Sequence, residues 1–215
     1  DIPWVPLAND EAAIELGMRF RSTQNGFITG VRYYKGAGAT GTHIGSLWNN
    51  AGTTRLAQAT FVNETASGWQ QVLFSSPVAI TAGVTYVVSY FSPSGDYAAT
   101  KPYFTTAVVN GPLIGLADGT DGANGLYRYT TTSAFPNSSF QSSNYWVDVV
   151  FSTGGTSGVA PTVTSQPVSQ SICAGTNVSF TSSATGTPVP TAQWQVSTNG
   201  STWSNIPGAT NGTMT

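Results

Sequence analysis

Short runs of apolar residues, separated by Gly, Pro and Asn, recur along the chain as far as residue 151. In residues 26–34, Phe27 and Tyr33 would lie on one face of an extended strand, and Ile28 and Tyr34 on the other. Apolar groups on both faces are typical of a strand between a core and a partly covered surface. The pattern predicts strands at residues 14–21, 26–34, 45–49, 53–62, 68–73, 85–91, 125–129 and 145–151.

Many short strands with turn residues between them favour an all-β fold, an antiparallel β-sandwich of the jelly-roll or Ig/fibronectin-like kind. A helical pattern is confined to residues 9–16, where Asp10 would cap the first turn, and so short a helix is marginal. Only 7% of residues are charged, whereas 40% are hydrophobic and 12% aromatic. The chain therefore has material for a core, and its Ser, Thr, Asn and Gly residues suit strands and turns.

A segment rich in Ser, Thr and Gly at residues 152–159 predicts a flexible linker. It divides the chain into a first domain, residues 1–151, and a second segment, residues 160–215. In an Ig-like sandwich a Trp on the third strand packs against the disulfide, and Trp194 would take that place.

Charge and hydropathy exclude two classes of partner. The net charge is −2, and the seven Lys and Arg residues are spread along the chain, so no cluster could neutralise several phosphates of a nucleic acid. No stretch approaches the ~18 consecutive apolar residues that a membrane-spanning helix needs.

Candidate catalytic groups are few. The chain has one histidine, His43, and one cysteine, Cys173, which precludes a multi-histidine metal centre. A Ser-His-Asp triad would have to use His43, which we expect at a turn, pointing to solvent or hydrogen-bonded locally. The nine carboxylates leave a glycosidase pair as an open alternative. We expect a protein that is not an enzyme.

A Gly-rich acidic loop is a candidate calcium site. Asp118, Asp121 and Asn124, with backbone carbonyls, could supply most of the six to eight oxygens that Ca²⁺ prefers. The alternative is a pair of Asp-Gly turns whose side chains cap their own backbone. A bound calcium would be structural and would fix the loop.

Aromatic residues near turns are candidates for stacking on sugar rings, with polar neighbours to orient hydroxyls. Trp69 and Trp146 stand in the middle of predicted strands, and we expect both in the core. Trp48 ends a strand and is expected at a loop rim, while Tyr127 and Tyr129 flank Arg128. The candidate ligand-binding residues are Trp48, Asp96, Tyr97, Lys101, Tyr103, Tyr127 and Arg128.

Two stretches resemble known families. The motifs Pro161-Thr-Val-Thr-Ser-Gln-Pro, Cys173-Ala-Gly-Thr-Asn-Val-Ser-Phe and Gln193-Trp-Gln-Val-Ser resemble the Ig-like repeats of large secreted bacterial proteins, particularly those of Bacteroidetes. Such domains run about 80–100 residues, so the resemblance implies a partial Ig-like β-sandwich. Cys173 would then be a half-cystine whose partner lies in strands that are missing here.

The first domain resembles the bacterial family of unknown function called DUF4082. The resemblance is carried by Glu15-Leu-Gly-Met-Arg-Phe, Gly30-Val-Arg-Tyr-Tyr-Lys-Gly, Leu116-Ala-Asp-Gly-Thr-Asp-Gly and Asn144-Tyr-Trp-Val-Asp-Val-Val-Phe, among others. It implies a β-sandwich in a multidomain extracellular protein, with no assigned activity.

Together these features predict a non-catalytic module of a larger secreted or cell-surface protein that binds a glycan or mediates adhesion. The alternative is a purely structural spacer or display domain, and an enzyme is a third, less favoured reading. The expected partners are a polysaccharide or cell-surface glycan and other domains of the same chain, with no nucleic acid and no membrane span. We favour binding over a spacer because the chain has long turn-rich loops, where function concentrates, at residues 36–45, 92–102 and 112–124.

Overall fold

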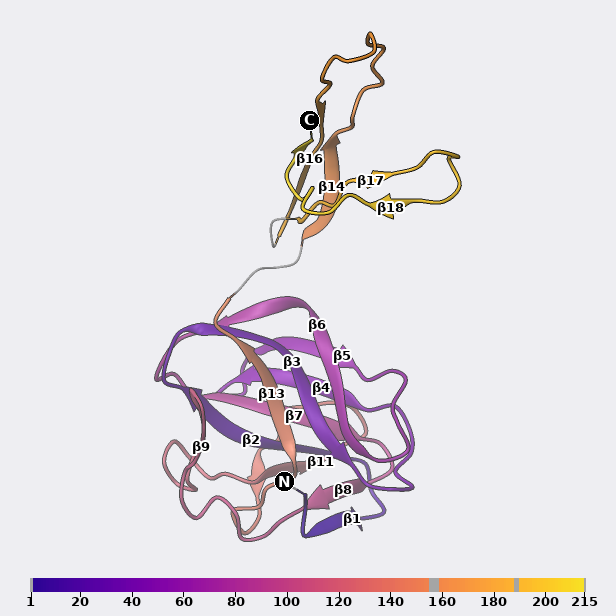
Figure 1. The fold of residues 1–215 in the computed structure, drawn as a ribbon. Coiled ribbons are helices and arrows are strands. Elements are labelled where there is room, and N and C mark those ends of the chain that lie inside the picture. The colour runs from indigo at the N-terminus through magenta and orange to yellow at the C-terminus, as the bar shows by residue number, and fades with distance from the viewer. Residues whose placement is uncertain (1, 155–158, 188–189, 215) are drawn as a thin grey trace. The chain divides into compact units, whose positions relative to one another are not determined.

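The computed structural model describes residues 2–154, 159–187 and 190–214, and these ranges contain strands and turns but no helix. The chain divides into two compact units, Asp1–Gly155 and Thr156–Thr215. The division falls within the segment predicted as a linker, residues 152–159, of which residues 155–158 lie outside the described part. The all-β fold predicted from the sequence is confirmed (Figure 1).

The larger sheet of the first unit has eight strands, and all of its pairs are antiparallel. Its two central strands pair from Ile14↔Ser92 to Phe20↔Tyr86. Alternate side chains of each strand enter the core, as the period of two in the sequence requires. The order across the sheet is β12 (Ser138–Ser139), β11 (Leu126–Tyr129), β2 (Ile14–Ser22), β7 (Tyr86–Ser92), β4 (Ile44–Asn49) and β5 (Arg55–Thr60), with β10 (Leu113–Gly115) beside β2 and β9 (Val108–Asn110) beside β10.

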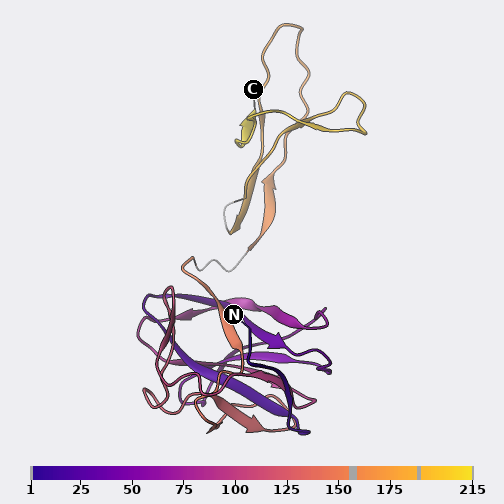
Figure 2. The same ribbon diagram turned by 60° about the horizontal axis from the view of Figure 1, so that its bottom comes forward.

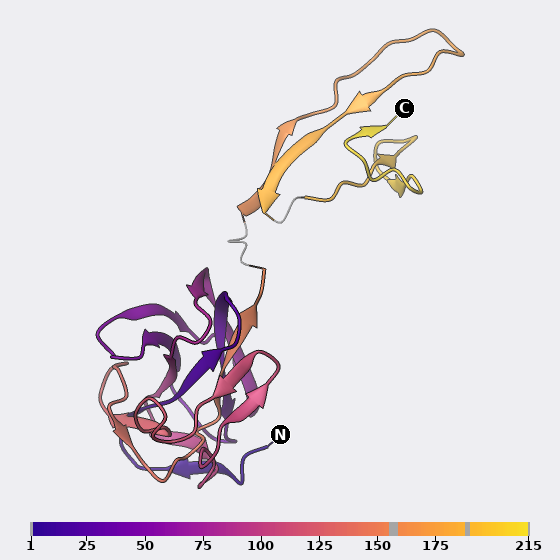
Figure 3. The same ribbon diagram turned by 90° about the vertical axis from the view of Figure 1, so that its left-hand side faces the viewer.

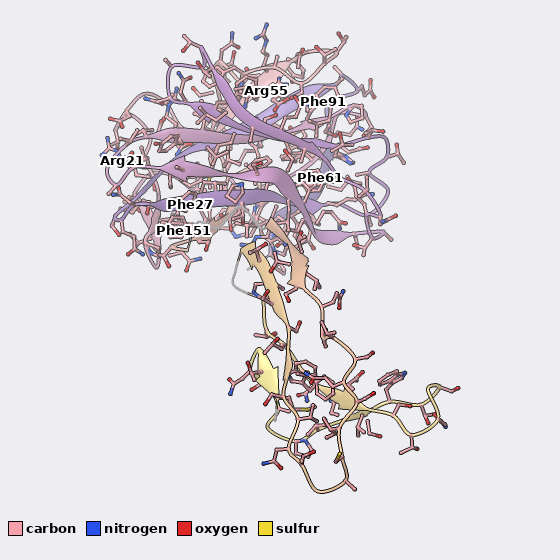
Figure 4. The ribbon with its side chains drawn as sticks, turned by 90° about the horizontal axis from the view of Figure 1, so that it is seen from above. Arg21, Phe27, Arg55, Phe61, Phe91 and Phe151 are labelled. Atoms are coloured by element: carbon pink, nitrogen blue, oxygen red, sulfur yellow. The ribbon has the colours of Figure 1, made fainter. Side chains whose placement is uncertain are left out.

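A smaller sheet of three strands faces the larger one, which makes the unit a β-sandwich (Figures 1 and 2). Its strands are β13 (Val147–Ser152), β3 (Gly26–Lys35) and β6 (Gly68–Ile80), in that order. Phe27 and Phe151 lie close together at one end of this sheet (Figure 4). Gly26 has no room for a side chain there, because an added Cβ would lie 2.4 Å from the Phe151 ring.

A two-stranded pair, β1 (Val5–Asn9) with β8 (Asp96–Ala99), closes one end of the unit. The bridge between Thr100 and Asn144 continues this pairing towards the start of β13. β13 then runs to the opposite end of the unit (Figures 1 and 3). The residues just after β8 and just before β13 are therefore neighbours.

The main hydrophobic core fills the space between the two sheets. Tyr33, Tyr90, Phe20 and Phe104 are among its largest fully buried side chains. The rings of Tyr33 and Tyr90 stack with centroids 4.5 Å apart. Each fully buried apolar side chain of this size stabilises the fold by roughly 1.5–3 kcal/mol relative to an exposed one.

A second, smaller cluster covers the outer face of the larger sheet. Trp48, Val87 and Leu126 are buried there, and Phe135 packs against them. Glu15 is fully buried on β2, where it accepts hydrogen bonds from the Ser89 hydroxyl at 2.5 Å and the Ala134 N–H at 3.2 Å. The loop between β11 and β12 thus lies across this face of the sheet.

Most strands lie where the sequence pattern predicts them, within a few residues at each end, with β6 extending further than expected to Ile80. The helical pattern at residues 9–16, too short to predict a helix, forms none: that segment holds the end of β1, a bend and the start of β2. The short strands β1, β8, β9, β10 and β12 were not expected. They carry too few alternating residues to give a pattern of their own.

The second unit consists of two-stranded pairs. None of its described side chains is buried, and Val168 and Trp203 are 74% and 60% exposed. Cys173 is free and exposed, so its pairing in a disulfide stays a prediction. Trp194 is half-buried and donates its Nε1–H to the Asn211 carbonyl at 2.8 Å. The strands are β14 (Val159–Ser165) with β16 (Ser183–Thr187), β15 (Phe180–Thr181) with β19 (Thr213–Met214), and β17 (Gln195–Val196) with β18 (Ser204–Asn205).

Candidate functional site

Aromatic side chains from several separate segments enclose a pocket of about 330 Å³ at one end of the first unit. We call it the tyrosine pocket. Ile14 and Tyr145 are buried, Tyr97 and Tyr127 are half-buried, and the other lining residues are exposed. The residues that line the pocket are Asp10, Ile14, Tyr97, Lys101, Tyr127, Tyr129, Phe140 and Tyr145. Its size falls at the lower end of the range for small-ligand sites.

The carboxylate of Asp10 joins two walls of the tyrosine pocket. It accepts a hydrogen bond from the Tyr129 hydroxyl at 2.7 Å and one from the Tyr97 hydroxyl at 3.1 Å. Asp10 itself is placed by its backbone N–H, which donates to the Gly95 carbonyl at 3.1 Å. An exposed carboxylate fixed between two phenols is a ready acceptor for a ligand hydroxyl.

Strand alternation places two tyrosines of β11 on the pocket side. Tyr127 and Tyr129 are two residues apart, so both point to the same face, with ring centroids 5.7 Å apart in an edge-to-face contact. Arg128 points to the opposite face, where its guanidinium lies 3.5 Å from the Phe135 carbonyl. Arg128 therefore does not join the tyrosine pocket, contrary to the expectation from its place between two tyrosines.

Three tyrosines of the pocket, Tyr97, Tyr129 and Tyr145, have raised pKa values and stay protonated at neutral pH. The hydrogen bond to Asp10, with some burial and the Asp10 charge, raises the pKa of Tyr129 to about 12. Burial, followed by the charge of Asp10 and the hydrogen bond to it, raises the pKa of Tyr97 above its usual value near 10. Burial also raises the pKa of Tyr145 to about 12. These groups can donate hydrogen bonds but do not act as bases.

The lining of the pocket also includes a positive charge. The ammonium of Lys101 lies 5.1 Å from the centroid of the Phe140 ring, a cation–π contact, and both side chains are exposed. Tyr97 packs edge-to-face on the buried Tyr145, with centroids 5.6 Å apart. One anion, one cation and several aromatic faces thus surround the opening.

The structure brings together three of the seven predicted ligand-binding residues, Tyr97, Lys101 and Tyr127. Asp96 instead accepts a hydrogen bond from the Asn9 amide at 2.5 Å, outside the pocket lining. Tyr103 lines a separate cavity, described below. No sequence pattern pointed to Phe140 or Tyr145 as pocket residues, because their segments form a wall only in the folded protein.

The expectation that Trp48 lies at an exposed loop rim is wrong. The side chain is 6% exposed, and its Nε1–H donates to the Ser89 hydroxyl at 2.8 Å. Arg55 lies over its ring at 4.3 Å from the centroid, and Phe135 packs edge-to-face against it. Phe135, which covers Trp48 on the outer face of the larger sheet, is distant in sequence. The position of Trp48 at a strand end therefore does not predict its burial.

The acidic loop is held by its own hydrogen bonds. Asn124 is fully buried, and its side-chain oxygen accepts the N–H groups of Arg19 at 2.8 Å and Gly125 at 2.9 Å. Its amide group donates to the carbonyls of Leu116 at 2.7 Å and Arg19 at 3.1 Å. Asn124 thus continues the ladder of β2 where β10 ends and β11 has not yet begun.

The two carboxylates of the loop also have partners. Asp118 accepts the N–H of Asn124 at 2.7 Å and the hydroxyl of Ser142 at 3.0 Å. Asp121 pairs with Arg21 and accepts a hydrogen bond from Thr85, and these contacts lower its pKa. Within the described residues, no three His, Cys, Asp or Glu side chains gather as metal ligands. The geometry favours capped turns, and calcium binding stays a prediction.

His43 is fully buried in the core and does not point to solvent, contrary to expectation. Its Nδ1 lies 2.9 Å from Glu64, whose carboxylate also pairs with Lys35 at 2.7 Å. Burial lowers the pKa of His43, against the opposing charge of Glu64. The ring packs on Tyr33 with centroids 4.9 Å apart. A buried histidine in such a cluster supports the core and has no access to a substrate.

Residues 1–147 match the model of a family described as "Domain of unknown function (DUF4082)". The chain belongs to this family. The match covers nearly the whole first unit, so the resemblance predicted from the sequence motifs is confirmed there. Residues 162–215 match a second family model, "Domain of unknown function (DUF8696)", in the segment where an Ig-like domain was expected.

The chain is also similar to Endoglucanase C of Cellulomonas fimi. The two are 45% identical over 56 residues, which are 26% of this chain and 5% of that protein. The chain therefore corresponds to a small part of the length of that relative. The described part of the chain holds no helix of the length and apolarity that a membrane crossing requires.

Proposed function

We propose that the first unit is a non-catalytic carbohydrate-binding module and that it holds a neutral glycan in the tyrosine pocket. The observation that carries this proposal is the Asp10 carboxylate, fixed between the hydroxyls of Tyr97 and Tyr129 beside exposed aromatic rings. The apolar face of a sugar ring stacks on aromatic side chains, while its hydroxyls bond to a fixed carboxylate.

The charge of the site supports a neutral ligand over a polyanion. Asp10 and Lys101 are the two side chains with full charges that line the tyrosine pocket, and they have opposite signs. A polyanion would need a cluster of cations, and the chain has only seven Lys and Arg residues in all. Hydroxyl-rich, uncharged sugars suit this surface.

The lining also supports binding without catalysis. Hydrolysis of a glycosidic bond generally uses two carboxyl groups, one on each side of the bond. The tyrosine pocket is lined by one carboxylate, Asp10, and the raised pKa values of Tyr97, Tyr129 and Tyr145 keep these hydroxyls protonated at neutral pH. Glu15, whose pKa is raised to about 7 by burial, is fully buried and does not line the pocket.

The setting of the protein is part of the same proposal. We place the chain in a secreted or surface protein in which this unit directs the whole molecule to a polysaccharide or to a glycan on a cell. The similarity to part of a protein named an endoglucanase supports β-glucans as the first ligands to test. The second unit, with its exposed apolar side chains, is proposed as part of an Ig-like spacer.

The test is binding to polysaccharides by affinity gel electrophoresis and calorimetry. Soluble β-glucans, xylan and mannan are the probes, and wild-type protein is compared with Tyr129→Ala and Tyr129→Phe. Loss of the ring should weaken binding by about tenfold or more, as for other aromatic contact residues. Loss of the hydroxyl alone should cost less, because Tyr97 still holds Asp10 in place.

Trp203→Ala is the matched control, since Trp203 is exposed on the second unit and lines neither cavity. It should bind as the wild type does. If the wild type binds none of a broad panel of plant, algal and microbial glycans, the proposal is wrong, and the result favours the alternative of a purely structural spacer. If Tyr129→Ala binds as tightly as wild type, the glycan site lies elsewhere.

A further inference from the structure

A second cavity of about 570 Å³ lies along β13, the edge strand of the smaller sheet. We call it the edge groove. One wall is β13 with the ends of Arg32 and Trp69, and the other is the hairpin of β9 and β10 (β9 and β13 in Figure 1). Apolar side chains from the core, including Met18 and Leu113, form the floor.

The mouth of the edge groove carries an aromatic ring that sequence reasoning placed in the core. Trp69 is 41% exposed, while its neighbour Trp146 is buried as expected. The two rings lie 6.0 Å apart, and the guanidinium of Arg32 lies over Trp69 at 5.3 Å. Asn110 on β9 adds an exposed amide to the opposite wall. A solvent-facing indole with polar groups on either side suits a sugar ring.

The edge of β13 is poorly suited to pairing with another strand. The carboxylate of Asp148 accepts the N–H of Val149 on its own strand at 2.8 Å and pairs with Arg32. A charged side chain that occupies a backbone donor at a sheet edge is a known way to block strand addition. The edge groove therefore favours a ligand with hydroxyl groups over an extended peptide.

One wall separates the edge groove from the tyrosine pocket. Lys101 lines the pocket and Tyr103 lines the groove, with Pro102 exposed between them. Because two peptide units join Lys101 to Tyr103, their Cα atoms lie at most about 7 Å apart. On the other segment of this wall, just before β13, Tyr145 lines the pocket and the adjacent Trp146 lines the groove.

Backbone hydrogen bonds hold the two segments of this wall together. Thr100 and Asn144 exchange N–H···O bonds at 2.9 Å, and the N–H of Tyr103 donates to the Ser142 carbonyl at 3.0 Å. The crest at Lys101, Pro102 and Tyr103 is therefore a fixed ridge over which a chain ligand can lie, with Lys101 and Pro102 exposed and Tyr103 half-buried.

From this shared wall we infer that the edge groove is a second subsite for the same ligand, and that the ligand is a linear, neutral oligosaccharide long enough to cross the crest. This inference rests on the function proposed for the tyrosine pocket. Occupation of two neighbouring subsites by one chain makes the second contact intramolecular, which strengthens binding without new kinds of contact. Affinity should therefore depend on the length of the glycan.

The experiment is calorimetry with cello-oligosaccharides from the disaccharide to the hexasaccharide, and with xylan and mixed-linkage glucan fragments of the same lengths. The variants are Trp69→Ala and Val109→Arg, the second placing a long side chain at an exposed position of the groove. Trp203→Ala is the matched control for removal of an exposed indole. A thermal melt of each variant checks that it is folded.

We expect wild-type affinity to rise by about tenfold or more between the short and the long oligosaccharides. Both groove variants should lose this gain while binding short oligosaccharides as the wild type does, and Trp203→Ala should keep it. Equal affinity for all lengths, or a length dependence that survives both groove variants, would overturn the inference and leave the function of the tyrosine pocket standing. If the wild type binds no oligosaccharide at any length, the glycan-binding function proposed for the tyrosine pocket is wrong, and the inference of a second subsite falls with it.

Discussion

Glu15 is an ionisable side chain in a fully buried position. It stands in β2 between two core residues and is fully buried on the outer face of the sheet. Burial raises its pKa from 4.5 to about 7, against the hydrogen bonds from Ser89 and Ala134. The folded protein therefore holds a proton on Glu15 that the unfolded chain releases at lower pH.

This difference makes stability depend on pH in a defined direction. Below pH 4.5 Glu15 is protonated in both states, so its contribution to stability is fully present. As the pH rises from 4.5 to about 7, the unfolded chain ionises first, and stability is lost. The loss amounts to about 3 kcal/mol at completion, from 1.36 kcal/mol for each pKa unit. Burial of His43 acts in the opposite sense, because its lowered pKa costs stability as the pH falls below 6.5.

Glu15→Gln should remove most of the loss of stability towards alkaline pH. The amide is neutral at every pH and can still accept the Ala134 N–H while donating to the Ser89 oxygen. Urea denaturation at about pH 5 and about pH 8 gives the free energy of unfolding. We expect the variant to be more stable than wild type at the higher pH, by up to about 3 kcal/mol. The same pH slope in both proteins would contradict the assignment.

At the scale of elements, a side chain of the loop between β10 and β11 makes hydrogen bonds to the backbone of β2 that a neighbouring strand would otherwise make. β10 pairs with β2 from Phe20 to Ser22, and β11 pairs with it from Ile14 to Gly17. The side chain of Asn124 fills the gap by bonding both the N–H and the carbonyl of Arg19. An amide is needed because it offers an acceptor and a donor together.

Asn124→Asp should therefore destabilise the first unit. A carboxylate could keep the hydrogen bonds from Arg19 and Gly125 but would face the carbonyls of Leu116 and Arg19 with no donor. The expected loss is about 2–4 kcal/mol in the free energy of unfolding, measured by urea denaturation.

Asp118→Asn is the control in the same loop, since an amide oxygen can still accept the Asn124 N–H, and it should change stability by less than about 1 kcal/mol. Calcium should leave the melting temperature of the wild type unchanged. A calcium-dependent rise that Asp118→Asn abolishes would contradict the interpretation of the loop as capped turns and would support the ion site.

The edge elements also decide where the ligand residues meet. β1 and β8 pair through Asn9↔Asp96 and so bring Asp10 beside Tyr97, although 87 positions separate the two residues. Neither strand has a clear pattern, so the sequence identified Tyr97 and Lys101 by residue type and loop position alone. In the sequence Asp10 stood out only as a possible cap of a helical pattern too short to predict a helix, and its place at the tyrosine pocket appears only in the folded protein.

At the scale of the whole molecule, the two units differ in how they are stabilised. Every buried side chain among the described residues belongs to the first unit. The second unit has short paired strands and leaves apolar side chains such as Val163 and Trp203 more than half exposed. Stability measured on the full chain should therefore be that of the first unit.

A chain that ends at residue 152 should unfold in one transition at the melting temperature of the full chain, within about 2 °C. Calorimetry on both chains is the measurement, and the shorter chain should bind glycans as the full chain does, because both cavities lie in the first unit. A melting temperature lowered by many degrees would mean that the second unit contributes to the core of the first.

The sequence by itself determined the all-β class and the central strands, and it predicted a linker at residues 152–159, within which the two compact units divide, because these features follow from the period of apolar residues and from local composition. It also selected Tyr97, Lys101 and Tyr127 as ligand candidates. The tertiary structure alone decided which side chains are accessible. Trp48 is buried because Phe135, distant in sequence, packs over it on the outer face of the larger sheet, whereas Trp69 on β6 stays 41% exposed. Long-range packing of this kind leaves no local periodic signal.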